Sequence, residues 1–332
     1  MQTTSIQNNP KSQAQATALM MGLLLMGIKF WAWWATNSNA ILTDALESII
    51  NVVAAAFGLY SIWLAALPRD RNHPYGHGKI EFISAGFEGA LIAIAGITIM
   101  GKGVYNLFHP QPIQQLTLGL ALTAGAGLAN YLLGVYLQRA GRENNALILI
   151  ASGAHLKSDA YSSAGLVAGL GLVMATGIPM LDNLLALGFG AVILITGYRL
   201  VRESVAGIMD EADYQLIEKM VQTLREKRHT GWIDIHNFRV IKYGATLHID
   251  CHMTLPWYYD LERGHDEVKA FEEVMKNACS GPVELFVHID PCEPPANCAL
   301  CPVQNCMYRQ QKQEAEVIWT LDNIMKNQKH QL

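Results

Sequence analysis

Long apolar stretches separated by short polar segments run along the chain up to about residue 205. A helix needs roughly 20 such residues to cross the hydrocarbon core of a bilayer. Three tryptophans near the end of the first stretch suit the aromatic belt at a membrane interface. We therefore expect six transmembrane helices, at about residues 16–36, 40–66, 82–108, 116–138, 147–176 and 180–205.

The remainder of the chain has the pattern of a water-soluble α/β domain. Apolar residues recur at helical spacing in two segments, and they alternate with polar residues in others. The predicted elements are a helix at 211–228, strands at 233–241 and 245–255, a helix at 260–278 and a strand at 283–289. A turn at Tyr243-Gly244 joins the first two strands. This α-β-β-α-β order resembles half of a ferredoxin-like fold.

We therefore expect two folded domains with a tail at each end. The boundaries are a polar N-terminal tail at 1–14, a six-helix transmembrane domain at 15–207, a cytoplasmic ferredoxin-like domain at 208–291 and a Cys-rich tail at 292–332. The last of these segments is predicted to contain a terminal helix at about 308–327.

Composition and charge placement agree with a membrane protein. Of the 332 residues, 51% are hydrophobic and 16% are charged, against roughly 25% charged in soluble domains. Lys and Arg occur in the connections at 68–81 and 138–146, whereas the opposite connections contain none. The positive-inside rule then predicts that both termini are cytoplasmic. The net charge of −4 includes no basic block, so we expect no nucleic-acid partner.

Two pairs of polar residues interrupt the predicted membrane helices. Glu47 and Asn51 stand four residues apart in one helix, and His155 and Asp159 stand four apart in another. This spacing places each pair on one helix face. Ionisable groups inside a membrane usually face a bundle interior or a water-filled cavity. Together the pairs offer ligands that suit a divalent metal ion; alternatively, they hydrogen-bond the helices together.

Four segments resemble the cation diffusion facilitator family. They are NAILTDALESIIN at 39–51, HPYGHGKIE at 73–81, HLKSD at 155–159 and VHIDPC at 287–292. The resemblance implies a homodimeric secondary transporter, and not an enzyme, in the bacterial inner (plasma) membrane. It would export divalent metal ions in exchange for protons by alternating access, with a ferredoxin-like domain in the cytoplasm.

The resemblance also assigns the transport site to Glu47, Asn51, His155 and Asp159. The family commonly has His or Asp at the first position and Asp at the second, so Glu47 and Asn51 depart from its pattern. Asn51 is a weaker ligand and cannot take up a proton. The metal therefore stays open among zinc, iron, manganese and cobalt. A metal-sensing or scaffold subunit with weak or no transport is the alternative function.

Two further groups of residues resemble metal sites of the family. The first group lies in the loop between the second and third helices and consists of Asp70, His73 and His77. The second lies in the cytoplasmic domain, where metal would have a regulatory role, and consists of His236, His252, His265, His288 and Asp290. The alternative for each group is ordinary turn or strand histidines in contact with solvent.

All six cysteines lie in the soluble part of the chain, and four of them fall within fifteen residues. These four are Cys292, Cys298, Cys301 and Cys306. A Cys-x-x-Cys pair with two flanking cysteines predicts a tetrahedral zinc–thiolate site. An iron–sulfur cluster and reduced thiols without a ligand are the alternatives.

Overall fold

A computed structural model describes residues 10–36, 39–109, 117–176, 178, 180–244, 246–279 and 281–331. Within these ranges the side chains of some helical residues, Asp44 and Glu47 among them, lie outside the description. The chain divides into two compact units, Met1–Met209 and Asp210–Leu332. We call them the membrane unit and the cytoplasmic unit, after the locations that the sequence predicts.

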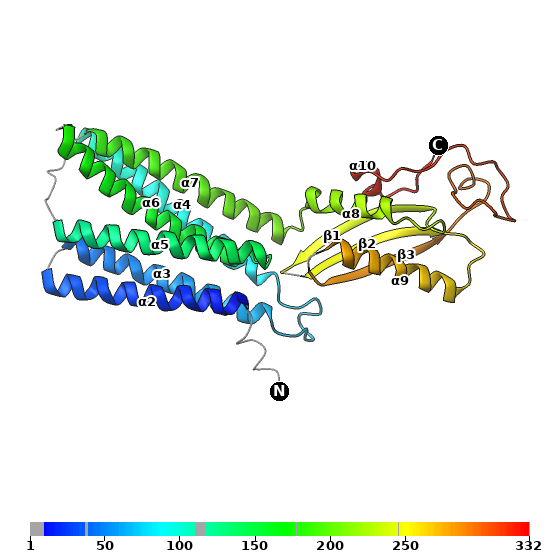
Figure 1. The fold of residues 1–332 in the computed structure, drawn as a ribbon, viewed down its shortest axis with the longest axis horizontal. Helices are drawn as coiled ribbons and strands as arrows, with labels where there is room; N and C mark the ends of the chain where they lie inside the picture. Colours follow the sequence, from blue (N-terminus) through cyan, green and yellow to red (C-terminus); the bar gives the residue numbers. More distant parts are fainter. Residues whose placement is uncertain are drawn as a thin grey trace. The chain divides into compact units, whose positions relative to one another are not determined.

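The described part of the membrane unit consists of six long helices (Figure 1). Their bounds are α2 Pro10–Thr36, α3 Asn39–Ala65, α4 Ile80–Phe108, α5 Thr117–Glu143, α6 Leu147–Thr176 and α7 Met180–Ile208. Each has 27 to 30 residues, which exceeds the length needed to cross a bilayer. α2 begins at Pro10, six residues before its predicted start and inside the predicted N-terminal tail, and α5 ends five residues after its predicted end. The other four helices lie within three residues of the predicted ranges.

Four segments of these helices are apolar and long enough to be membrane spans. Within the described residues they are Pro10–Trp31, Ser48–Ala65, Ile80–Phe108 and Asn183–Ile208. The prediction of membrane spans is thus confirmed for α2, α3, α4 and α7. α5 and α6 are equally long, but their described residues contain no apolar segment of this kind, and α6 carries the polar residues His155, Lys157 and Asp159.

Two pairs of helices pack at very short distance because glycines face the neighbouring backbone. A side chain at Gly96 of α4 would come within 2.7 Å of the backbone nitrogen of Leu194 on α7. Between α5 and α6, a side chain at Gly134 would come within 2.8 Å of the carbonyl oxygen of Gly153. Small residues allow membrane helices to approach this closely. α4 with α7, and α5 with α6, therefore form close-packed pairs.

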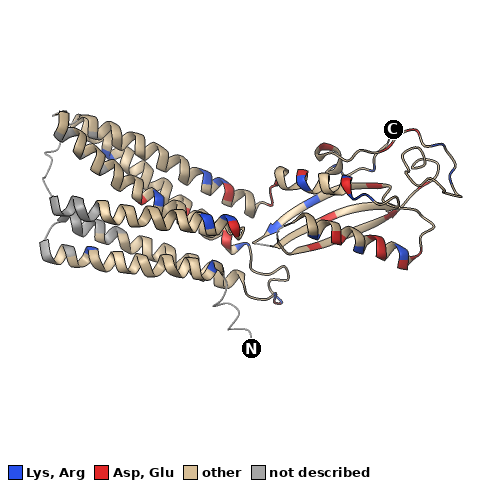
Figure 2. Ribbon diagram, in the orientation of Figure 1, with Lys and Arg blue, Asp and Glu red and all other residues tan. Residues whose placement is uncertain are grey.

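The surface of the membrane unit suits a lipid environment. Large apolar side chains remain exposed along the helices, among them Ile94, Ile97, Leu132 and Ile195. Charged residues are sparse along the helices and gather at the end of the bundle where α4 and α6 begin (Figure 2). This distribution is typical of an integral membrane protein.

The cytoplasmic unit is built around a three-stranded sheet. Its elements are α8 Tyr214–Glu226, β1 Asp234–Tyr243, β2 Thr246–Leu255, α9 Leu261–Ala278 and β3 Val283–Pro291, in the predicted α-β-β-α-β order. β2 is the central strand and pairs antiparallel with β1 and parallel with β3. Both helices contact the sheet residues in one core, in which Trp232, Phe238 and Phe271 are fully buried.

The predicted terminal helix at about 308–327 is wrong for most of its length. In the described tail, the final helix is α10, which spans only Leu321–Ile324. The preceding residues have no regular secondary structure, and the backbone N–H of Glu314 donates to the carbonyl oxygen of Ala299. Trp319 is buried in the same core as the sheet. Packing against the domain thus replaces the local hydrogen bonds that a helix would have made.

Candidate metal centre

α3 and α6 bring three of the four predicted transport-site residues into contact. Nδ2 of Asn51 donates a 2.6 Å hydrogen bond to Oδ2 of Asp159, and Oδ1 of Asn51 lies 2.9 Å from Nε2 of His155. Nε2 of His155 is 3.9 Å from Oδ2 of Asp159. The amide of Asn51 therefore bridges the imidazole and the carboxylate. The side chain of Glu47, one turn away on α3, lies outside the described residues.

This hydrogen-bond pattern assigns a hydrogen to one ring nitrogen of His155. Since Oδ1 of Asn51 only accepts, Nε2 of His155 carries a hydrogen in this arrangement. Nδ1 of His155 is buried and has no hydrogen-bond partner among the described residues. A metal ion bound at Nε2 requires that the hydrogen move to Nδ1 or leave the ring.

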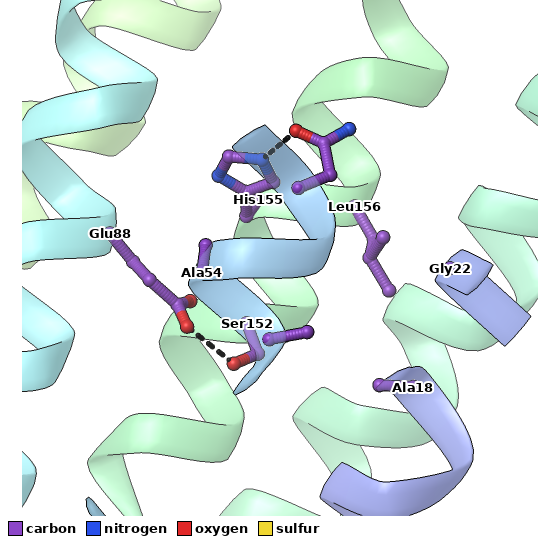
Figure 3. A pocket seen from close by; sticks show the side chains of 9 residues that line it. Ala18, Gly22, Ala54, Glu88, Ser152, His155 and Leu156 are labelled. Atoms are coloured by element: carbon purple, nitrogen blue, oxygen red, sulfur yellow. Dashed lines mark hydrogen bonds between the residues drawn. The ribbon is translucent and has the colours of Figure 1, made fainter. Parts of the chain in front are cut away.

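A second group of buried polar residues lies next to these three, and sequence reasoning missed it. Glu88 of α4 accepts a 2.7 Å hydrogen bond from Oγ of Ser152 on α6. The same Oγ of Ser152 accepts a 3.0 Å hydrogen bond from Nε2 of Gln15 on α2. Figure 3 shows the carboxyl group of Glu88 turned toward Ser152, away from the ring of His155. The available signal was a carboxylate in the middle of an apolar span, which is a functional-site candidate by default.

A cavity of about 30 Å³ connects the two polar groups. Its polar lining residues are Asn51, His155, Glu88 and Ser152, and small residues of α2 and α3 together with Leu156 of α6 complete its walls. This volume is enough for about one water molecule or one ion.

The loop between α3 and α4 brings its three predicted ligands together. One ligand atom each from Asp70, His73 and His77 lies within 4.8 Å of the other two. The backbone N–H groups of His73 and Asn72 donate to Asp70, and these bonds hold the pKa of the Asp70 carboxyl below its usual value. Asp70 and His73 are exposed, so solvent ions reach this group directly.

The sheet of the cytoplasmic unit aligns three of its predicted histidines. His236 of β1, His252 of β2 and His288 of β3 are direct neighbours across the strands. Ligand atoms of His236, His252 and Asp290 lie within 4.8 Å of one another, and Nε2 of the exposed His288 is 3.5 Å from Oδ1 of Asp290. The remaining predicted member, His265, lies exposed on α9 and stays apart from this group.

Two residues that the sequence did not suggest lie beside this histidine cluster. Asp234 contacts His236 at 3.3 Å and accepts two hydrogen bonds from the backbone and ring of His330 in the tail. Burial raises the pKa of Asp234, but the bonds and charge of His330 outweigh it, so the pKa lies below its usual value. Burial also lowers the pKa of His236, more than Asp234 raises it.

The four tail cysteines form a compact segment. Cys298 and Cys301 are buried, and the backbone N–H of Cys301 donates to the carbonyl oxygen of Cys298. Arg309 donates to the carbonyl oxygens of Cys298, Cys301 and Val303 and so fixes the turn. Burial, together with the neighbouring thiols, raises the pKa of Cys292. Among the described residues, no three of these sulfurs lie within 4.8 Å of one another, whereas the ligand atoms of the two histidine sites do.

Two known protein families match this chain, one in each unit. Residues 16–209 match the cation efflux transmembrane domain, and residues 210–292 match the cytoplasmic domain of cation efflux proteins. The chain belongs to the cation diffusion facilitator family.

Relatives in bacteria agree with this assignment. An uncharacterized transporter, sll1263, of Synechocystis sp. is 34% identical over 277 residues, which cover 82% of this chain and 88% of the relative. The cation-efflux pump FieF of Citrobacter koseri is 27% identical, over 85% of this chain and 93% of the pump. FieF of Cronobacter sakazakii is 26% identical over similar shares, 85% and 93%.

Membership in this family gives the general function of the chain. As a cation diffusion facilitator, the chain is an integral membrane protein and a divalent cation efflux transporter rather than an enzyme. Metal ions are its transported substrate, and its cytoplasmic unit is of the type found in cation efflux proteins.

Proposed function

We propose that this cation diffusion facilitator exports a divalent transition metal in exchange for protons, and that Glu47, Asn51, His155 and Asp159 bind the metal. The contact of Asn51 with both His155 and Asp159 is the observation that carries the proposal. It puts an imidazole, an amide oxygen and a carboxylate from two helices within reach of one ion. Imidazole with carboxylates suits zinc, iron, manganese or cobalt.

Charge balance supports binding at this depth. Ionised Glu47 and Asp159 carry two negative charges, which neutralise a divalent ion in a medium where an isolated charge is costly. When the metal leaves, His155 and the two carboxylates can take up protons, whereas Asn51 cannot. The exchange of metal for protons thus follows from the same ligands.

The transport cycle requires that the site open to each side in turn. All six long helices cross the membrane in this proposal, and the bundle rocks around a site at mid-depth. Both termini face the cytoplasm of a bacterial inner membrane, so efflux runs from the side of the Asp70, His73 and His77 loop. That loop then takes up metal from the cytoplasm.

The cytoplasmic unit has a regulatory role in this proposal. It has a ferredoxin-like fold and joins two identical subunits. Metal at His236, His252, His288 and Asp290 would hold the strands of the unit in one arrangement and so link dimer geometry to metal concentration. His265 contributes to such a site only by a change in its position, because it stands apart from the others.

The tail binds structural zinc through Cys292, Cys298, Cys301 and Cys306 in the same proposal. The clamp of Arg309 on the Cys-x-x-Cys turn supports it, since structural zinc sites hold such turns rigidly. Elemental analysis of the purified protein should find zinc that Cys298→Ser removes and that Cys279→Ser, outside the tail, leaves in place. Visible absorption of an iron–sulfur cluster, or no metal at all, would contradict it.

A flux assay in proteoliposomes tests the transport function. Vesicles that contain the unmutated protein should take up metal and release protons, and Asp159→Ala should abolish both. Glu143→Ala, which changes an exposed acid at the end of α5, is the control. Undiminished exchange by Asp159→Ala would defeat the assigned site. Tight metal binding without flux in the unmutated protein would favour the scaffold alternative, which the substitution of Asn51 for an acid motivates.

A further inference from the structure

Glu88 is a buried carboxyl group that the proposed transport site does not use. It is 1% exposed, on α4, and its Oε1 accepts the hydrogen of Ser152. Its Oε2 is buried and has no hydrogen-bond partner among the described residues. Among the described residues, Glu88 forms no ion pair with Lys, Arg or His; Lys11 pairs with Glu81, and Lys157 donates to Gln138.

The hydrogen bonds around Glu88 leave a surplus of acceptors. Both hydrogens on Nε2 of Gln15 are used, one by Ser152 and one by the carbonyl oxygen of Ala55. The hydroxyl hydrogen of Ser152 is used by Glu88. Oε1 of the fully buried Gln15 is therefore a second acceptor without a donor. A bound cation would supply the partner that these two buried oxygens lack.

Gly58 of α3 lets Gln15 and Glu88 converge. A side chain at this position would begin 2.5 Å from Nε2 of Gln15 and 3.5 Å from Oε1 of Glu88. The two groups therefore meet at one point of the α3 backbone. Four helices contribute to this point, and the cavity shared with Asn51 and His155 opens beside it.

We propose that Glu88, Ser152 and Gln15 form a second cation-binding position, which holds the divalent metal ion before it enters the transport site. This inference rests on the proposed function for the direction of travel. Carboxylate, hydroxyl and amide oxygens are weak ligands for transition metals compared with imidazole, so the ion is held loosely and passes on to His155.

The position along the helices fits such a relay. Ser152 lies three residues before His155 on α6, and Ala55 lies four residues after Asn51 on α3. On both helices this is one turn closer to the end of the bundle that carries the Asp70, His73 and His77 loop. The ion thus meets the loop, then Glu88, then the transport site.

Metal binding with the transport site disabled tests the position directly. In full-length Asp159→Asn, equilibrium dialysis against Mn²⁺, followed by electron paramagnetic resonance, should detect residual weak binding within the bundle. Adding Glu88→Gln should lower that affinity about tenfold. Adding Ser84→Ala instead should leave it unchanged, because Ser84 is a buried polar residue one turn away on the same helix and outside the cavity. Equal binding in all three proteins would overturn the proposal.

Transport kinetics give an independent reading. Glu88→Gln alone should raise the KM for metal about tenfold and change kcat by less than about threefold, and Ser152→Ala should act in the same direction. An unchanged KM, with only the response to a pH gradient lost, would show that Glu88 binds a proton instead and would overturn the cation site. Absence of flux in the unmutated protein would refute the proposed function, whereas the dialysis result would still decide the binding position.

Discussion

The two units of the chain hold their ionisable side chains in different ways. In the interior of the membrane unit, Asn51 bridges His155 and Asp159, and Ser152 donates to Glu88, so the hydrogen-bond partners of these ionisable groups are neutral side chains. In the cytoplasmic unit, Asp234 contacts His330 and Asp290 contacts His252, so each carboxylate has an imidazole as its partner. A carboxylate with only neutral partners keeps its negative charge for an arriving cation to balance.

The largest expected effect comes from a comparison in which one aspartate of each unit is replaced by asparagine. Asp159→Asn should reduce metal flux about 100-fold, since the loss of even an outer group around a metal commonly costs 10- to 100-fold. Asp290→Asn should leave flux within a few-fold and instead weaken metal binding at the cytoplasmic cluster. Flux in proteoliposomes and metal titration of the purified protein measure the two effects. Equal loss of flux in both variants would remove the distinction between the units.

Placing a charge in the neutral network should have the next largest effect. Asn51→Asp adds an anionic ligand beside Asp159, so metal affinity should rise about tenfold at pH 7.5. The crowded carboxylates should also take up a proton when the metal is absent, and affinity should then fall more steeply toward pH 6. Titrations at both pH values test this, with the buried Asn130→Asp of α5 as the matched control. An unaltered pH dependence would contradict it.

Removing the histidine partner of a buried carboxyl group in the cytoplasmic unit should reduce stability. His330→Ala removes the partner of buried Asp234 and should cost about 1–3 kcal/mol, because the remaining carboxylate stays buried without its donors. Hydrogen exchange of the β1 amides, measured by mass spectrometry, should become faster in proportion. Gln331→Ala, next to it and exposed, is the control and should change exchange little. No change at β1 would mean that the tail does not hold the strand.

Acidification should weaken the cytoplasmic unit in two stages. The pKa of His236 in the folded unit lies below its ordinary value of 6.5, so the unfolded chain binds the proton first. Stability is therefore fully present above about pH 6.5 and is lost as the pH falls below it. Asp234, with its lowered pKa, adds a second loss below its ordinary value of 3.8.

Hydrogen exchange at several pH values, corrected for the intrinsic rate, measures this loss. Protection of β1 and β2 should decline between pH 7.5 and 5.5. Asp213, which caps α8 and has a lowered pKa through its bond to Lys242, contributes only below 3.8, so the start of α8 serves as an internal control. Protection of β1 that increases toward pH 5.5 would contradict the sign.

Local patterns in the sequence predict the elements and the ligand pairs well. Spacing of four residues on one helix was enough to place His155 with Asp159, and alternation was enough for β1 and β2. Contacts between distant segments escaped prediction. Glu88, Ser152 and Gln15 lie on three helices, and no single segment shows that they meet. The prediction of a helix in the tail was wrong for a related reason. Trp319 packs in the core of the domain, and this distant contact, not a local helical pattern, determines the conformation of the tail.

The glycine contacts at Gly96 and Gly134 have a consequence for motion in the bundle. Backbones that touch cannot slide past one another without losing their packing, so α4 travels with α7, and α5 travels with α6. Glu88 belongs to the first pair, whereas Ser152 and His155 belong to the second. The bond between Glu88 and Ser152 therefore joins the two helix pairs, so the rocking of the bundle in the proposed transport cycle would stretch this bond.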